Sequence, residues 1–242
     1  MTNYWLIILL LMFSNCAEER ENDIYPDSGS SPAPHLPTPY TAYNFLALGD
    51  SYTIGESISE DQRWYLQLID SLKEAGVPIK ESDVIAQTGW TTGELTDAIE
   101  QSGNQKKYDI VSLLIGVNNQ YRGQSIETYK NEFRELLNTA VNFANSKKQH
   151  VIVLSIPDWG VTPFGTSNGD PPKIAQEIDE FNEAAKAECA AMGIHFIDIT
   201  EISRLAKNEP SFVAIDGLHF SGKMYQLWAK EAFPFAKEIL GE

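Results

Sequence analysis

Three residues of the types that can together catalyse acyl transfer, a serine, a histidine and an aspartate, occur in turn-like surroundings of this sequence. Ser51 follows Gly49 and Asp50 directly after a short apolar run, and His219 comes three residues after Asp216 in the segment DGLH. A serine hydroxyl becomes a strong nucleophile when a neighbouring imidazole accepts its proton. A carboxylate three residues away in a turn reaches the imidazole N–H and fixes its tautomer. The pattern predicts that Ser51 attacks an acyl carbon, with His219 as base and Asp216 as its partner.

Two further positions, Gly89 and Asn118, have the chemistry of oxyanion stabilisation. Each follows a short apolar run, Gly89 in QTGW and Asn118 in GVNN. Attack on an ester carbonyl places negative charge on its oxygen, and fixed hydrogen-bond donors stabilise that intermediate. Glycine lets its backbone N–H approach a ligand closely, and the asparagine side chain carries an NH₂ donor. Both are candidate oxyanion-hole residues, provided that the fold places them beside Ser51.

The elements that must position these residues alternate between short apolar runs and longer segments with apolar residues at helical spacing. Such alternation predicts a parallel sheet with helices on both faces, a three-layer α/β/α sandwich. The nearly continuous apolar run at 110–115 indicates a strand buried on both faces. The predicted strands are 45–48, 84–86, 110–115, 151–155 and 194–199. The predicted helices are 62–75, 92–101, 126–145, 172–192 and 221–240.

A flavodoxin-like strand order, 2-1-3-4-5, brings the candidates to one edge of this five-stranded sheet. The first strand then lies between the second and third, so that Ser51 is flanked by Gly89 and Asn118. Ligands bind at the carboxyl ends of the strands in sheets of this kind. His219 follows the last apolar segment and returns to this edge, whereas His150 and His195 precede strands and belong at the opposite end.

Taken in order, the four motifs resemble those of the GDSL/SGNH hydrolase family. GDS at 49–51 is similar to the nucleophile block of that family, and Gly89 to its glycine block. GVN at 116–118 is similar to the G-x-N block, and DGLH at 216–219 to the D-x-x-H block. Each motif is short, but their order and spacing cover the chain from about residue 44 to about residue 240.

The resemblance implies a serine esterase that needs neither metal nor cofactor. It implies a triad of Ser51, His219 and Asp216. It also implies an oxyanion hole built from the N–H groups of Ser51 and Gly89 and the side chain of Asn118. Three neighbouring positions depart from the usual family pattern without removing a catalytic group: Tyr52, Asn119 and Phe220. These departures leave the substrate preference open rather than the class of reaction.

Aromatic residues in the loops near the predicted site are candidate substrate contacts. They are Trp90, Tyr121 and Trp159, the last within the Gly- and Pro-containing loop 156–165. Trp90 and Trp159 have the size to stack on a sugar ring or to pack an acyl chain, and equally to pack the loops themselves. An acetylated glycan, a lysolipid and a small soluble ester all remain open as substrates.

The N-terminus has the features of an export signal. The apolar run 4–13 is too short to span a bilayer, which needs about 20 apolar residues, but has the length of a signal-peptide core. Cys16 follows this run, and the arrangement resembles a bacterial lipoprotein signal, with residues 1–15 removed and Cys16 lipidated. An ordinary signal peptide with an incidental cysteine is the alternative. Residues 16–42 are rich in Ser, Pro and charge and predict a flexible tether before the domain at 43–242.

Composition limits the partners. The formal net charge of −16 disfavours nucleic acid and anionic lipid headgroups as ligands. We therefore expect membrane contact only through a lipid anchor at Cys16, in an exported protein on the periplasmic side or the cell surface. The oligomeric state is left open.

Two other classes of protein fit the same fold. A non-catalytic carbohydrate-binding module is the main alternative, although all three triad residues are present. A flavin or nucleotide protein would need a phosphate-binding loop after the first strand, where Asp50 instead repels phosphate. A metalloenzyme is disfavoured because no group of His, Asp or Glu residues has the spacing of metal ligands.

Overall fold

The computed structural model describes residues 42–241. The predicted signal peptide (1–15), the lipidation site Cys16 and the predicted tether up to residue 41 lie outside the described residues, and they stay predictions. The first strand begins at Tyr43. Within the described part of the chain, no helix is both long and apolar enough to cross a bilayer.

The centre of the molecule is a parallel sheet in the order β2-β1-β3-β4-β5, which confirms the predicted strand order. Gly49, the last residue of β1, pairs with Ala86 at the end of β2 on one side and with Leu114 at the end of β3 on the other. The three strands therefore end at the same level, and the loops that follow them start side by side. The strands are β1 (Tyr43–Gly49), β2 (Ile79–Ala86), β3 (Ile110–Leu114), β4 (Val151–Leu154) and β5 (His195–Ile197).

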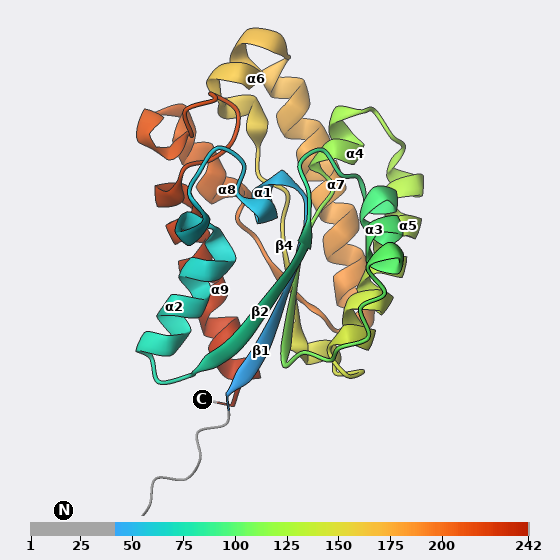
Figure 1. Cartoon of the computed structure of the whole chain (residues 1–242). Helices are drawn as coiled ribbons and strands as arrows, with labels where there is room; N and C mark the ends of the chain where they lie inside the picture. The colour runs from blue at the N-terminus through green and yellow to red at the C-terminus, as the bar shows by residue number, and fades with distance from the viewer. Residues whose placement is uncertain (1–41, 242) are drawn as a thin grey trace, which may run out of the picture. The chain divides into compact units, whose positions relative to one another are not determined.

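Helices cover both faces of the sheet, as expected for a three-layer α/β/α sandwich (Figure 1). On one face α2 (Trp64–Glu74) packs against α9 (Gly222–Ile239). The other face carries α3 (Thr92–Ser102), α5 (Ile126–Phe143) and α7 (Pro171–Met192). Four shorter helices lie in the connections: α1 (Ser51–Ile54), α4 (Val117–Tyr121), α6 (Pro163–Asn168) and α8 (Thr200–Ser203). Five 3₁₀ turns, η1 (Glu60–Gln62), η2 (Lys148–His150), η3 (Trp159–Val161), η4 (Arg204–Lys207) and η5 (Pro210–Phe212), complete the described elements.

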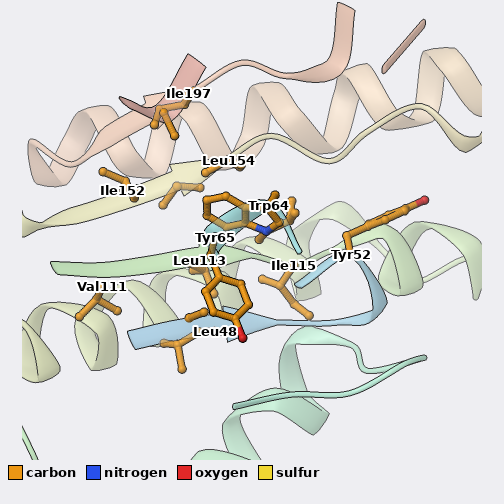
Figure 2. Packing of buried hydrophobic residues seen from close by; sticks show 14 of the residues in the cluster. Leu48, Tyr52, Trp64, Tyr65, Val111, Leu113, Ile115, Ile152, Leu154 and Ile197 are labelled. Carbon is orange, nitrogen blue, oxygen red and sulfur yellow. The ribbon is translucent and has the colours of Figure 1, made fainter. Parts of the chain in front are cut away.

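The core lies on both faces of the central strands. Every residue of β3 and β4 is buried, in accord with their continuous apolar sequences. Full burial of one such aliphatic side chain stabilises the fold by about 1.5–3 kcal/mol relative to its exposed state. Figure 2 shows buried side chains of this core. By the pairing of the strands, Leu48, Val111 and Leu113 lie on one face of the sheet and Ile152, Leu154 and Ile197 on the other.

The predicted second strand was too short. We predicted 84–86, whereas β2 begins at Ile79 and includes the exposed residues Lys80, Glu81 and Ser82. β2 is an edge strand, so this half of it faces solvent and carries no apolar signal. The predicted fifth strand was too long, because α8 starts at Thr200 shortly after β5 has ended at Ile197.

Candidate active site

Ser51 is the first residue of α1, directly beyond the carboxyl end of β1. The turn between them is tight: a Cβ at Gly49 would lie 2.4 Å from the Leu114 carbonyl oxygen, so only glycine fits there. Asp50 caps the helix, and its Oδ1 accepts a hydrogen bond from the Tyr52 N–H at 3.0 Å. This strand-to-helix turn holds Ser51 at the edge of the sheet where the predicted site lies.

Asp216 and His219 meet in the turn that precedes α9. His219 Nδ1 lies 2.6 Å from Asp216 Oδ2, and the backbone N–H groups of Leu218 and His219 donate to Asp216 Oδ1, each at 2.9 Å. Gly217 adopts a φ of 72°, a left-handed conformation that closes the turn. Burial acts to raise the pKa of Asp216, but hydrogen bonds, that of His219 foremost, outweigh it and lower the pKa to about 2. The carboxylate is therefore ionised at neutral pH.

Ser51 and His219 face the same small cavity, which has a volume of about 170 Å³. Because Nδ1 of His219 is bonded to Asp216, Nε2 is the ring nitrogen that remains for a partner in this cavity. The cavity is lined by Ser51, Tyr52, Val117, Asn118, Tyr121, Trp159, Phe164, Leu218 and His219. The structure thus brings together the predicted serine and histidine, the predicted amide donor and two of the three predicted aromatic contacts.

The side chain of Asn118 is oriented by the loop that carries Gly89. Asn118 Nδ2 donates a hydrogen bond to the Trp90 carbonyl oxygen at 2.9 Å. The NH₂ group has two protons, so one remains for a ligand. Gly89 lies in a turn closed by the bond from the Trp90 N–H to the Gln87 carbonyl, with a φ of 89°. Such a turn requires glycine, and Gly89 itself is not among the residues that line the cavity.

Two neighbours of Asn118 bind the same loop and fix its position. Arg122 donates to the Gly89 carbonyl oxygen through Nη2 and to Glu94 through Nη1. Asn119 is buried, and its Oδ1 accepts from the Thr92 N–H at 3.1 Å while its Nδ2 donates to Thr92 Oγ1. Hydrogen bonds from the segment that follows β3 therefore hold the segment that follows β2 in place. These bonds explain why Asn119 departs from the usual family pattern. Its amide both donates and accepts hydrogen bonds here, whereas an ionised aspartate can only accept.

The three predicted aromatic contacts have different surroundings. Trp159 is buried, donates from Nε1 to Gln120 Oε1 at 2.8 Å and makes an edge contact with Tyr121 at 5.4 Å between ring centroids. It both packs its loop and lines the cavity. Tyr121 is 58% exposed and lies at the mouth. Trp90 packs against the hydrophobic core and does not line the cavity.

Several residues of the site had no distinctive sequence signal. Val117 and Leu218 complete the cavity wall and are variable positions of the motifs at 116–118 and 216–219. Phe164 also lines the cavity and belongs to the loop 156–165 that was predicted to lie near the site. Asp158 was also missed: it is buried, accepts from the Gly160 N–H and pairs with Arg204 at 3.0 Å, which holds the Trp159 loop. Within residues 42–241, no three His, Cys, Asp or Glu side chains form a group that could hold a metal ion.

The comparison with protein families defines the class of this protein, a hydrolase of carboxylic esters. The sequence profile of the GDSL-like lipase/acylhydrolase family matches residues 47–227, which is most of the chain. The chain therefore belongs to that family. A search of the curated proteins finds no match.

Solved structures with a similar fold include three esterases. The psychrotrophic esterase EstA from Pseudoalteromonas sp. superposes with a TM-score of 0.61 at 16% identity, over 82% of this chain and 99% of that one. The acetylxylan esterase Axe2 from Geobacillus stearothermophilus gives 0.62 at 16% identity, over 83% and 94%. The family 3 carbohydrate esterase from Clostridium thermocellum gives 0.64 at 18% identity, over 82% and 97%. At these identities the likeness establishes the shared fold.

Proposed function

We propose that this enzyme hydrolyses short-chain carboxylic esters through an acyl-enzyme formed on Ser51, with His219 and Asp216 completing a catalytic triad. The observation that carries the proposal is the 2.6 Å contact between His219 Nδ1 and Asp216 Oδ2. The His219 imidazole and Ser51 line the same cavity. An oriented imidazole beside a serine at the end of a strand is what nucleophilic acyl transfer requires.

In the first half of the reaction the Ser51 Oγ attacks the ester carbonyl carbon and its proton passes to His219 Nε2. The C–O bond to the alcohol then breaks, and the imidazolium returns the proton to the leaving alcohol. In the second half, water attacks the acyl-enzyme, gives its proton to His219, and the acid departs as Ser51 recovers its hydrogen. The ionised Asp216 stabilises the imidazolium in both halves.

In this proposal three hydrogen-bond donors stabilise the negative charge on the tetrahedral intermediate: the N–H groups of Ser51 and Gly89 and the free proton of the Asn118 amide. Ser51 and Asn118 line the cavity, whereas Gly89 does not and is included because it matches the glycine block of the family. Because Asn118 is already bonded to the Trp90 carbonyl, its amide does not have to reorganise when the charge develops. Fixed donors of this kind supply a large part of the rate enhancement in acyl transfer.

The size of the cavity favours a short acyl group. Its volume of about 170 Å³ lies below the roughly 300–1,000 Å³ typical of sites for larger ligands. Two structural relatives are named as esterases of acetylated xylan or of carbohydrate. An acetyl ester carried by a glycan is therefore our first candidate substrate, with Tyr121 at the mouth as a surface for a sugar ring.

Ester hydrolysis by the purified chain tests the proposal. We expect turnover of p-nitrophenyl acetate above butyrate, little turnover of octanoate, and loss of all turnover in Ser51→Ala. A fluorophosphonate probe should add to the wild-type chain at Ser51, as detected by peptide mass spectrometry. Turnover retained by Ser51→Ala would refute the serine mechanism. A chain that binds acetylated xylo-oligosaccharides but neither hydrolyses esters nor reacts with the probe would be a carbohydrate-binding module instead.

We propose further that the enzyme is exported and anchored to a bacterial membrane through a lipid on Cys16. The support is the apolar run at 4–13, followed after Ser14 and Asn15 by Cys16 and then by a polar stretch. Metabolic labelling of the full chain with a fatty-acid analogue should mark the wild type and leave Cys16→Ala unlabelled. Equal labelling of both chains would place the modification elsewhere.

A further inference from the structure

Ser57 has an unusual backbone conformation at a place where the catalytic groups converge. Its φ is 64°, in the left-handed region that non-glycine residues rarely adopt. Its hydroxyl donates to Asp216 Oδ2 at 2.7 Å, across 159 residues of sequence. Asn145 and Ser146 also have positive φ, but they lie in the turn after α5 at the opposite end of the sheet. A strained backbone conformation of this kind persists only where the surrounding structure imposes it, and such conformations are often found at functional sites.

The other hydrogen bonds of Asp216 are local. Those from Leu218 N–H, His219 N–H and His219 Nδ1 all start within three residues of the carboxylate. They shape the turn, but they move with it and cannot fix where it lies relative to Ser51. Among the described residues, Ser57 is the donor that reaches Asp216 from a separate part of the chain.

The backbone of Ser57 is in turn tied to the nucleophile. The N–H groups of Gly55 and Glu56 both donate to the Ser51 carbonyl oxygen at 3.0 Å. Glu56 also accepts a hydrogen bond from the hydroxyl of Thr88, the residue before Gly89. A short path of bonded groups thus leads from Ser51 through residues 55–57 to the carboxylate of the triad, with a side link to the loop of the predicted oxyanion hole.

We infer that Ser57 is a positioning residue, which sets the distance and orientation of the Asp216–His219 pair relative to Ser51 through its hydrogen bond to Asp216 Oδ2. This inference rests on the proposed triad mechanism. Ser57 itself touches neither the cavity nor the reacting atoms. Although Ser57 is exposed, its hydroxyl is bonded to the carboxylate.

Two variants separate the hydroxyl from the backbone conformation. Ser57→Ala removes the hydrogen bond and keeps the strain, whereas Ser57→Gly removes both. If the hydroxyl positions the triad, both variants lower kcat for p-nitrophenyl acetate about five- to tenfold, which is typical for a lost bond to a charged group that water partly replaces. KM should stay within about twofold, because no substrate contact is lost.

A pH profile supplies a readout that a purely structural role would not change. Without the Ser57 donor, the Asp216 carboxylate is more basic and holds the imidazolium more strongly. The acid limb of kcat/KM should therefore move to higher pH in both variants. Ser59→Ala is the matched control, since Ser59 is an exposed serine two residues further on whose side chain makes no capping bond. It should leave kcat, KM and the pH profile unchanged.

The outcomes distinguish this inference from the proposed function. Loss of kcat with a shifted acid limb in Ser57→Ala and Ser57→Gly supports it. Wild-type kcat in Ser57→Gly would overturn it, because the hydroxyl would then be dispensable. Full turnover in Ser51→Ala, measured on the same plate, would overturn the triad mechanism instead, whatever the Ser57 variants do.

Discussion

Asp50 should make the enzyme less stable as the pH rises from 4 to 7, and Asp50→Asn should remove this effect. The carboxyl is 1% exposed, and its Oδ2 has no hydrogen-bond partner within residues 42–241. Burial raises the pKa of Asp50 from an ordinary 3.8 to about 7, against the smaller opposite effect of the bond from the Tyr52 N–H. A buried carboxyl of this kind is more stable protonated than charged.

The sign and size follow from proton linkage. Between pH 3.8 and about 7 the folded chain holds a proton on Asp50 that the unfolded chain has released, so unfolding becomes easier as the pH rises. A pKa difference of about 3 units, at 1.36 kcal/mol for each, amounts to roughly 4 kcal/mol. The stabilisation is fully present below pH 3.8 and has been lost once the pH exceeds about 7. Asparagine does not titrate in this pH range, and it keeps a side-chain oxygen for the Tyr52 N–H.

Urea unfolding of the wild type and Asp50→Asn at several pH values measures this difference. The free energy of unfolding of Asp50→Asn minus that of the wild type should increase by roughly 3–4 kcal/mol between pH 4.5 and 7.5, then level off. Comparison of two chains cancels the titration of the remaining acidic residues. Asp61→Asn, which removes a charge at an exposed position, should show no such trend. A difference that stays constant with pH, or that shrinks as pH rises, would refute the assignment of a protonated Asp50.

Three other predictions concern the cavity and its support. Asn118→Ala should lower kcat for p-nitrophenyl acetate by about 100-fold or more, with a small change in KM, because a donor to the oxyanion is lost; an unchanged kcat in steady-state assays would remove Asn118 from the oxyanion hole. Phe164→Ala should enlarge the cavity and raise the octanoate-to-acetate ratio of kcat/KM, whereas an unchanged ratio would show that the acyl chain lies elsewhere. Gly116→Ala should lower the free energy of unfolding by about 2 kcal/mol or more. Gly116 has a φ of 128°, and a Cβ there would lie 2.8 Å from the side chains of Ile156 and Tyr129. Urea unfolding measures the change, and a stability equal to that of the wild type would show that the turn relaxes at little cost.

Part of the site is encoded in short stretches of sequence. GDS at 49–51 comes directly after an apolar run, and DGLH at 216–219 places a carboxylate and an imidazole in one turn. The Asp216–His219 contact requires little beyond that turn, which is why its two residues could be paired from the sequence. The strand order was also predictable, because βαβ connections are right-handed and allow few arrangements of alternating elements.

Other features depend on contacts between distant segments. Ser57 is an exposed serine in an unremarkable loop, and only folding brings its hydroxyl to Asp216. Phe164 belongs to the cavity because its N–H bonds the Gly217 carbonyl at 2.8 Å, a link between two loops that no local pattern encodes.

The sequence by itself determined the order of elements and the family motifs and indicated the candidate residues for acyl transfer, because these follow from apolar periodicity and from short-range turn geometry. Only the tertiary structure decided that Trp90 packs on the core while Trp159 lines the cavity, although both follow strands as loop tryptophans. A side chain's direction in a loop is set by partners far away in the chain, such as Gln120 for Trp159, and a linear sequence does not contain those distances.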